Sequence, residues 1–394
     1  MAQKSFLMQT YGRLPVAFER GEGVWLWDTD GNKYLDALAG VAVCSLGHAH
    51  PALTKAICDQ AGQLLHTSNW YRIPVQETLA ERLCAVSAME RVFFSNSGAE
   101  ANEAAIKLAR LYGHNKGIDV PTIIVTDQSF HGRTMATLTA TGSRKAQAGF
   151  EPLVQGFARV PYDDLDAIRQ VASNNSDVVA VMVEPILGEG GVVIPRDGFL
   201  KSLREICDEN GWLLILDEIQ TGLCRTGKWF AAQHENVVPD VMTLAKALGN
   251  GMPIGACLAR GDAAETLVAG KHGSTYGGNP LACTAALAVI ETLQAEKFDQ
   301  VASQTGQYLL EKLQNGLAGM EGVREIRGKG LMIGIELDRD CGELMGAALD
   351  KGLLINVTAG NVLRLLPPLI LSQPQCDQLA AGVTELLNDF LAVS

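Results

Sequence analysis

Short apolar runs alternate with longer amphipathic stretches through the middle of the chain. Each run is too short for a helix and is almost entirely apolar, which is typical of a strand buried on both faces. The runs lie at residues 92–94, 122–125, 178–183, 213–216 and 241–244. Because they alternate with helical stretches from about residue 50 to about residue 290, we expect an α/β domain with a mostly parallel sheet and helices on both faces.

The two ends of the chain follow different patterns. Near the N-terminus, two strand-like runs flank Thr29-Asp30-Gly31-Asn32, which is typical of a β-hairpin turn. Helical periodicity dominates residues 282–317; shorter strand-like runs and a last helix follow at 331–337, 353–357, 362–366 and from about 374. These patterns predict three regions: an N-terminal segment that packs with the small domain (1–50), a large domain (51–290) and a smaller C-terminal α+β domain (291–394).

Two of the buried runs end close to a charged residue: Asp217 follows the run at 213–216, and Lys246 follows the run at 241–244. Open α/β sheets bind ligands at the carboxyl ends of their parallel strands, so we expect both side chains in one crevice. Such a pair suits pyridoxal phosphate (PLP). A lysine forms a Schiff base with its aldehyde, and an aspartate pairs with the protonated pyridine nitrogen. For the two residues alone, a structural ion pair is the alternative interpretation.

A strand, a tight loop and a strong helix follow one another around Ser97-Gly98-Ala99-Glu100. Free N–H groups at the start of that helix could bind a phosphate. Ser97 and Glu100 also form the pattern of a capping box, which needs no ligand. Neither a P-loop nor a dinucleotide fingerprint is present, because no Gly-Lys-Ser/Thr follows and Gly188-Glu189-Gly190-Gly191 has the wrong spacing.

Polar and aromatic residues follow other predicted strands. Phe130 could stack on a flat cofactor ring and Arg133 could bind a carboxylate, although core packing and a solvated cation are the ordinary alternatives. Glu184 ends a further strand. We therefore expect these side chains at the same edge of the sheet.

Two later segments add candidates. The glycine-rich loop at 273–280 contains Ser274 and Thr275, whose hydroxyls could reach a phosphate or a substrate. Arg364 is the one charge in an otherwise apolar strand. A buried charge must be paired or functional, because burying it alone is very costly.

Composition excludes several classes of function. Of 394 residues, 47% are hydrophobic and 19% charged, as in a well-buried globular protein. The net charge of −12 disfavours sequence-independent binding to nucleic acid or to an anionic membrane. No apolar stretch approaches the roughly 18 to 20 residues that span a bilayer, and the first residues show no signal-peptide pattern. We therefore expect a cytoplasmic protein.

The cysteines and histidines do not predict a metal site. Nine cysteines are scattered and never occur as a CxxC pair, so neither a disulfide framework nor a zinc site is indicated. His48-Ala49-His50 has no Cys, Asp or Glu at ligand spacing beside it.

Together these segments resemble the class III aminotransferases, PLP enzymes of fold type I, over essentially the whole chain. The most specific segments are Ser95–Asn102, Phe130–Arg133, Leu216–Gln220 and the segment around Lys246. Within that class, residues 273–283 and 66–69 are most similar to the acetylornithine aminotransferase group.

The resemblance implies a role for each cofactor contact. Lys246 would hold PLP as a Schiff base and carry a proton between the substrate and cofactor carbons, while Asp217 would keep the pyridine nitrogen protonated. The other implied contacts are Ser97, Gly98 and Ala99 at the phosphate, Phe130 on the ring and Gln220 near its hydroxyl. Thr275 would reach the phosphate of a neighbouring subunit, which implies a homodimer.

The resemblance also implies the reaction. The δ-amino group of N2-acetyl-L-ornithine would pass to 2-oxoglutarate, giving N-acetylglutamate 5-semialdehyde and glutamate, a step of arginine biosynthesis. Arg133 and Ser274 would hold the acylated donor, and Arg364 would bind the α-carboxylate of the keto acid. Glu184 would neutralise Arg364 when the donor binds.

Several alternatives remain open from the sequence. Succinylornithine, ornithine, N-succinyl-diaminopimelate and 4-aminobutyrate transaminases share most of these motifs, and pocket contacts that distinguish them contribute only about 1 to 3 kcal/mol each. An aminomutase or a racemase could use the same Lys and Asp. Arg72 could line the entrance or lie on the surface. A non-enzymatic PLP-binding protein is disfavoured, because every catalytic position is occupied and no basic DNA-binding segment exists.

Overall fold

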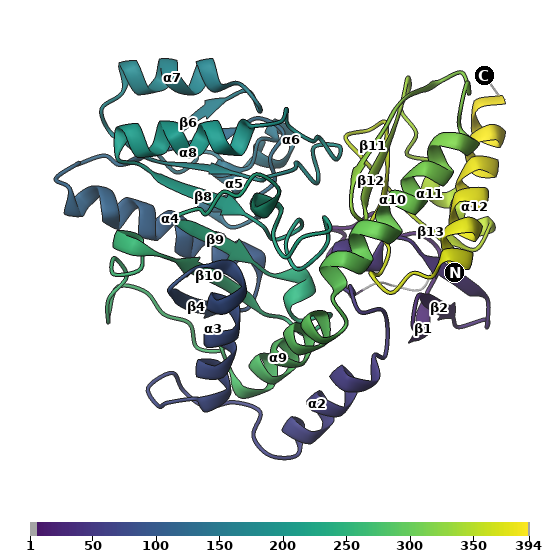
Figure 1. The fold of residues 1–394 in the computed structure, drawn as a ribbon, viewed down its shortest axis with the longest axis horizontal. Coiled ribbons are helices and arrows are strands. Elements are labelled where there is room, and N and C mark those ends of the chain that lie inside the picture. The colour runs from purple at the N-terminus through teal and green to yellow at the C-terminus, as the bar shows by residue number, and fades with distance from the viewer. Residues whose placement is uncertain (1–5, 393–394) are drawn as a thin grey trace.

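The computed structural model describes residues 6–392 of the chain. Residues 1–5, which belong to the stretch without a signal-peptide pattern, lie outside the described part. Figure 1 shows a larger part built around one sheet and a smaller part that contains the elements near both ends of the chain. Within residues 6–392, no helix is both long and apolar enough to span a membrane.

Seven strands form the sheet of the larger part: β4 (Arg91–Ser95), β5 (Thr122–Thr126), β6 (Phe157–Val160), β7 (Val178–Val183), β8 (Leu213–Asp217), β9 (Val241–Leu244) and β10 (Gly255–Ala259). Their order is β4-β10-β9-β8-β7-β5-β6. The pairs among β5 to β9 are parallel, whereas β10 is antiparallel to β4 and β9. The predicted mostly parallel sheet is confirmed. β6 and β10 were not predicted; β10 consists mostly of small residues and has no β-branched side chain.

Both faces of this sheet are covered, which explains why its strands are mainly apolar. Successive strand residues point to opposite faces. Leu213 and Ile215 therefore pack in the core that contains α4 (Gly98–Asn115). Leu214 and Leu216 pack in the core beneath α8 (Phe199–Asn210), next to α7 (Leu165–Asn174). The alternation leaves the strand ends as the place where polar side chains can face a ligand.

The smaller part contains two four-stranded sheets. The first joins β1 (Phe18–Glu22), β2 (Trp25–Asp28) and β3 (Lys33–Asp36) to β13 (Leu353–Leu354), and the second consists of β11 (Val323–Lys329), β12 (Met332–Leu337), β15 (Val362–Leu365) and β14 (Asn356–Thr358). The predicted hairpin is confirmed as β2 and β3. The strand expected at 353–357 is instead divided between the two sheets.

Helices connect and cover these sheets. The periodic stretch at 282–317 is two helices, α9 (Pro280–Ala295) and α10 (Phe298–Gly316), separated at Lys297, whose φ of 53° is left-handed. The chain closes with α11 (Leu344–Asp350) and α12 (Gln373–Ala392).

The domain boundaries stay a prediction, and residue 290 falls inside α9. The remaining elements are α1 (Ala39–Ala42), α2 (Pro51–Ala61), α3 (Pro74–Ser87), α5 (Met135–Ala140), α6 (Arg144–Gln147), η1 (Ala231–His234), η2 (Lys246–Leu248) and η3 (Gly261–Ala263).

A fully buried arginine ties the two parts together. The Nη1 of Arg225, in the loop after β8, donates to the carbonyl oxygens of Leu331 and Pro367 in the smaller part, and its Nη2 donates to the Ser45 hydroxyl. Its three partners are uncharged oxygens on three separate segments of the chain. The guanidinium is therefore held by the hydrogen bonds that it donates and not by an ion pair. Removing it would leave buried acceptors without a donor.

We expect Arg225→Met to lower the free energy of unfolding by about 2 to 4 kcal/mol, because charge-assisted hydrogen bonds are lost from a buried site. Urea unfolding measures this, and Arg169→Met is the matched control because Arg169 forms only an exposed ion pair with Asp166. Equal stability of the two variants would contradict this account.

Candidate active site

A cavity of about 390 Å³ opens at the carboxyl ends of β8 and β9, and we call it the Lys246 cavity. Most of the predicted site residues line it: Ser97, Gly98, Ala99, Phe130, Arg133, Glu184, Asp217, Gln220 and Lys246. These residues come from the start of α4 and its N-cap, from the loops after β5 and β7, from the end of β8 and the loop after it, and from the segment after β9. The sheet therefore brings together side chains that lie up to 149 positions apart (246 − 97).

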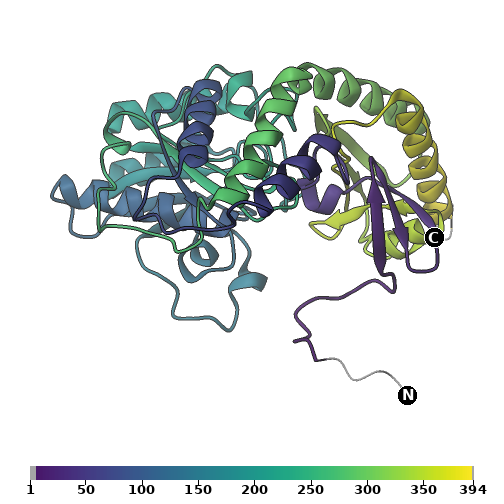
Figure 2. The same ribbon diagram turned by 90° about the horizontal axis from the view of Figure 1, so that it is seen from below.

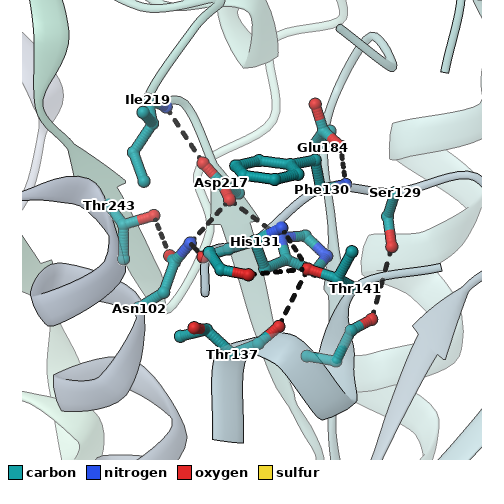
Figure 3. A network of polar contacts seen from close by, with 12 residues as sticks. Asn102, Ser129, Phe130, His131, Thr137, Thr141, Glu184, Asp217, Ile219 and Thr243 are labelled. Atoms are coloured by element: carbon teal, nitrogen blue, oxygen red, sulfur yellow. Dashed lines mark hydrogen bonds and ion pairs between the residues drawn. The ribbon is translucent and has the colours of Figure 1, made fainter. Parts of the chain in front are cut away.

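Asp217 lies at the end of β8 and is only 3% exposed. Its Oδ2 accepts hydrogen bonds from Asn102 Nδ2 and from His131 Nδ1, both at 2.8 Å, as Figure 3 shows. Its Oδ1 accepts from the backbone N–H of Ile219 at 3.1 Å. These donors hold a buried carboxylate at the wall of the cavity, where a protonated ring nitrogen could pair with it.

Lys246 begins η2 directly after β9, and its φ of 46° is left-handed. A non-glycine residue rarely adopts this conformation, and strain of this kind persists where the surrounding structure enforces it. Burial lowers the pKa of the Lys246 ammonium from its ordinary value. More of the neutral amine is then available, which is the form that attacks an aldehyde or accepts a proton.

The start of α4 forms one wall of the cavity. Ser97 caps the helix by accepting from the N–H of Glu100, and the Glu100 carboxylate accepts from the N–H of Asn96. The first-turn amides, including those of Gly98 and Ala99, have no helical partner and lie at the positive end of the helix dipole. A Cβ on Gly98 would lie 2.8 Å from the Ile219 side chain. Capping therefore leaves amides that could bind an anion, and this wall fits the phosphate of PLP.

Phe130 and Arg133 also line the cavity. The Phe130 ring lines it, and the guanidinium of Arg133 lies 5.6 Å from the centre of that ring. Arg133 is exposed, so it can reach a carboxylate at the mouth. An apolar ring face, an anion-binding helix start, a buried carboxylate and a lysine together fit PLP.

The structure corrects the predicted Glu184–Arg364 contact. Arg364 is 1% exposed, and its Nη1 forms an ion pair with Glu189 Oε1 at 2.7 Å. Its remaining donors bind Asn356 Oδ1 at 2.6 and 3.2 Å and Gln220 Oε1 at 3.3 Å. Burial alone would raise the pKa of Glu189, but the charge and hydrogen bond of Arg364 hold it below its ordinary value.

Glu184 is instead tied to the backbone. Its Oε1 accepts from the N–H of Phe130 at 2.7 Å and its Oε2 from the N–H of Gly188 at 3.0 Å. Burial raises the pKa of Glu184 to about 7, and the charge of Asp217 acts in the same direction. Glu184 therefore holds Phe130 in place, and Glu189 is the carboxylate that reaches Arg364.

Three predicted residues lie outside the lining of the cavity. Arg364 reaches it through its contacts with Glu189 and Gln220. The Ser274 hydroxyl accepts from Asn96 Nδ2 at 3.3 Å, so it lies one residue away from the wall. Thr275 lies in a separate surface hollow.

Arg72 takes part in a surface ion pair. It is exposed and binds Glu77 through Nη2 at 2.7 Å and through Nε at 2.9 Å. Among residues 6–392, no group of three or more His, Cys, Asp or Glu side chains is arranged to hold a metal ion.

Sequence reasoning missed four polar side chains that contact the site residues directly or through one another. Glu189 lies in the Gly188-Glu189-Gly190 segment, whose glycine spacing predicts no known site. His131 lies inside the recognised Phe130–Arg133 segment. Thr243 is the one polar residue of an otherwise apolar strand, and that pattern could have identified it. Asn102 lies on a helix that carries several charged residues, so its type alone gave no such signal.

Because the folded-state pKa of Glu184 is raised from 4.5 to about 7, the folded protein holds this proton more tightly than the unfolded chain. That contribution to stability is complete below pH 4.5 and is lost as the pH rises through about 7. We expect the stability of Glu184→Gln relative to the unsubstituted protein to rise between pH 5 and pH 8, by up to about 3 kcal/mol. Urea unfolding of the cofactor-free proteins measures it, and a difference that does not change with pH would overturn this assignment.

Comparison with known proteins identifies the family. The family profile described as aminotransferase class-III matches residues 7–387. The acetylornithine aminotransferase of Nitrosomonas europaea is 58% identical over 387 residues, which cover 98% of each chain.

Solved structures agree with this match. A structure of the Toxoplasma gondii ornithine aminotransferase, which reports partial occupancy of PLP at the active site, is 36% identical with a TM-score of 0.93, covering 97% of this chain and 91% of that one. The acetylornithine aminotransferase of Elizabethkingia anophelis is 34% identical with a TM-score of 0.87, covering 97% and 96%. These matches confirm the predicted fold, that of the PLP-dependent transferases of fold type I. The chain belongs to the class-III aminotransferases.

Proposed function

We propose that this PLP-dependent aminotransferase transfers the δ-amino group of N2-acetyl-L-ornithine to 2-oxoglutarate. The products are N-acetylglutamate 5-semialdehyde and glutamate, and the step belongs to arginine biosynthesis. The observation that carries the reaction is that Lys246 and Asp217 line one cavity with an anion-binding helix start. The choice of donor is supported by relatives named acetylornithine aminotransferase that are 45 to 58% identical over nearly the whole chain.

PLP supplies an aldehyde that accepts the amino group and a ring that withdraws electrons from the reacting carbon. The chain supplies the rest. Lys246, with its lowered pKa, would hold the aldehyde group through Nζ and, once the substrate amine has replaced it there, would carry a proton at Nζ. Asp217 would pair with the ring nitrogen, Phe130 would cover one ring face, and Gln220 would lie near the ring hydroxyl. Ser97, Gly98 and Ala99 would hold the phosphate.

Two substrates must use one site in turn. The keto acid carries an α-carboxylate next to its reacting carbon, whereas the ω-amine donor carries none there. Arg364 can bind that carboxylate with two donors only if Glu189 moves away, because Glu189 already holds Nη1 at 2.7 Å. When the donor binds, Glu189 stays and neutralises Arg364. Arg133 and Ser274 would then hold the acylated end of the donor.

We further propose a homodimer, located in the cytoplasm. The hollow around Thr275 is lined by His66, Asn69 and Trp70 and has a volume of about 780 Å³. Trp70 is 92% exposed and Tyr276 63%, and large exposed aromatic side chains are typical of an interface. In a homodimer formed through this hollow, Thr275 of each subunit would lie at the Lys246 cavity of the other subunit. Analytical ultracentrifugation measures the oligomeric state. A protein that sediments as a monomer and in which Thr275→Ala does not change the Kd for PLP would contradict this arrangement.

Other features support the same assembly and location. The segment before β1 extends away from the rest of the molecule in Figure 2 and exposes Met8 and Tyr11. All nine cysteines are free thiols, which is typical of a reducing compartment.

The test of the reaction is the visible spectrum of the PLP-loaded enzyme. N-acetylornithine should abolish the absorption band of the lysine-bound cofactor, and 2-oxoglutarate should restore it. Succinylornithine, ornithine, N-succinyl-diaminopimelate and 4-aminobutyrate are the competing donors to compare. A faster response to one of them would replace the proposed donor, and no response to any amine would overturn the aminotransferase assignment at this site.

We expect Glu189→Gln to shift the enzyme towards the α-carboxylate substrate. Without its counter-ion, Arg364 binds the carboxylate of 2-oxoglutarate more readily and faces the ω-amine donor with an uncompensated charge. The ratio of kcat/KM for 2-oxoglutarate to kcat/KM for N-acetylornithine should rise about tenfold.

Glu385→Gln is the matched control, because Glu385 pairs with Lys351 on the surface of α12. If both variants keep the ratio of the unsubstituted enzyme, Glu189 does not control access to Arg364.

A further inference from the structure

Behind Asp217 lies a short chain of buried polar side chains. Resting on the proposed pairing of Asp217 with the cofactor ring, we propose that Asn102, oriented by Thr243, is a positioning residue that turns Asp217 Oδ1 towards the ring nitrogen of PLP. Asn102 and Thr243 do not line the Lys246 cavity, so they act through Asp217.

The geometry joins three elements of the larger part. Thr243 on β9 donates its hydroxyl hydrogen to Asn102 Oδ1 at 2.7 Å. Asn102 on α4 donates through Nδ2 to Asp217 Oδ2 and to the carbonyl oxygen of His131, both at 2.8 Å. Thr243 also lies directly opposite Asp217 in the pairing of β8 with β9. Figure 3 shows Asn102 between the hydroxyl and the carboxylate.

The acceptor positions fix the direction of the Asn102 amide. Its NH2 group faces two oxygens that can only accept, the Asp217 carboxylate and the His131 carbonyl. If the amide were reversed, its own oxygen would lie against both of them without a hydrogen between. In this orientation the Asn102 amide oxygen faces Thr243, and the Thr243 hydroxyl donates a hydrogen bond to it.

This arrangement makes the two oxygens of Asp217 unequal. Oδ2 accepts from both Asn102 and His131 and is fully used. Among the described residues, Oδ1 accepts from the Ile219 amide, and a carboxylate oxygen can accept a second hydrogen bond. Oδ1 is therefore the atom with capacity for the N–H of a protonated ring.

Packing alone does not explain an asparagine at this place. Its buried neighbours on α4 are Ala101, Ala104, Ala105 and Ile106, and Asn102 is itself 0% exposed. Asparagine is a weaker helix former than alanine, and a buried amide is tolerated only when it is hydrogen-bonded. The position thus carries a polar side chain for its partners.

The test separates the ring nitrogen from the rest of the cofactor. Apoenzyme is titrated with PLP and with its deaza analogue, in which carbon replaces the pyridine nitrogen and no partner for Asp217 exists. The enzymes are the unsubstituted chain, Asn102→Ala, and the pair Thr243→Val and Thr243→Ser. The Thr243 pair differs in the hydroxyl while both keep a small side chain, so it tests the relay even if Asn102→Ala folds poorly.

We expect Asn102→Ala to raise the Kd for PLP about tenfold or more, and to change the Kd for the deaza analogue by less than about twofold. Thr243→Val should raise the Kd for PLP about threefold to tenfold, again without affecting the analogue, and Thr243→Ser should restore it.

If Asn102→Ala and Thr243→Val raise the Kd for PLP and the Kd for the analogue by the same factor, these residues act only through packing, and the proposal is overturned. Equal Kd values of Thr243→Val and Thr243→Ser for PLP would also overturn it. If the unsubstituted apoenzyme itself does not distinguish PLP from the analogue, the proposed pairing of Asp217 with the ring fails instead, which is a separate result.

Discussion

The buried carboxylate of Asp217 is the constraint on which the arrangement of the site depends. A carboxylate with 3% exposure must receive hydrogen bonds, and its donors come from α4, from the loop after β5 and from the loop after β8. Satisfying this one group fixes the helix start, the loop that carries Phe130 and the end of β8 relative to one another. The cofactor surfaces that these segments present are thereby set before any ligand binds.

The second constraint is the buried guanidinium of Arg364, which arrives from the smaller part of the molecule on β15. Its charge is matched by Glu189, in the loop after β7 of the larger part. Asp217 is held by three donors of the chain itself, whereas the proposed function has a substrate carboxylate replace Glu189 at Arg364. The proposed site thus combines a fixed cofactor side with an exchangeable substrate side, as an enzyme with two unlike substrates requires.

The sequence predicted those features that depend on local pattern. The strands before Asp217 and Lys246 are apolar on both faces because both faces are covered, and both residues could therefore be assigned to one edge of the sheet. The exchange of Glu184 for Glu189 could not be foreseen. Both follow β7, and which one reaches Arg364 depends on a turn in which Leu187 pairs with Val193 and Gly191 has a φ of 106°. Asn102 escaped notice because the neighbours of a helix face are not visible in the sequence.

Chemical trapping of the cofactor tests the central claim most directly. Borohydride reduction of the PLP-loaded enzyme fixes the lysine-bound cofactor as a stable amine, and peptide mass mapping then locates it. The account predicts a phosphopyridoxyl group on Lys246 alone. A label on another lysine, or bound PLP that forms no reducible bond to the chain, would contradict it.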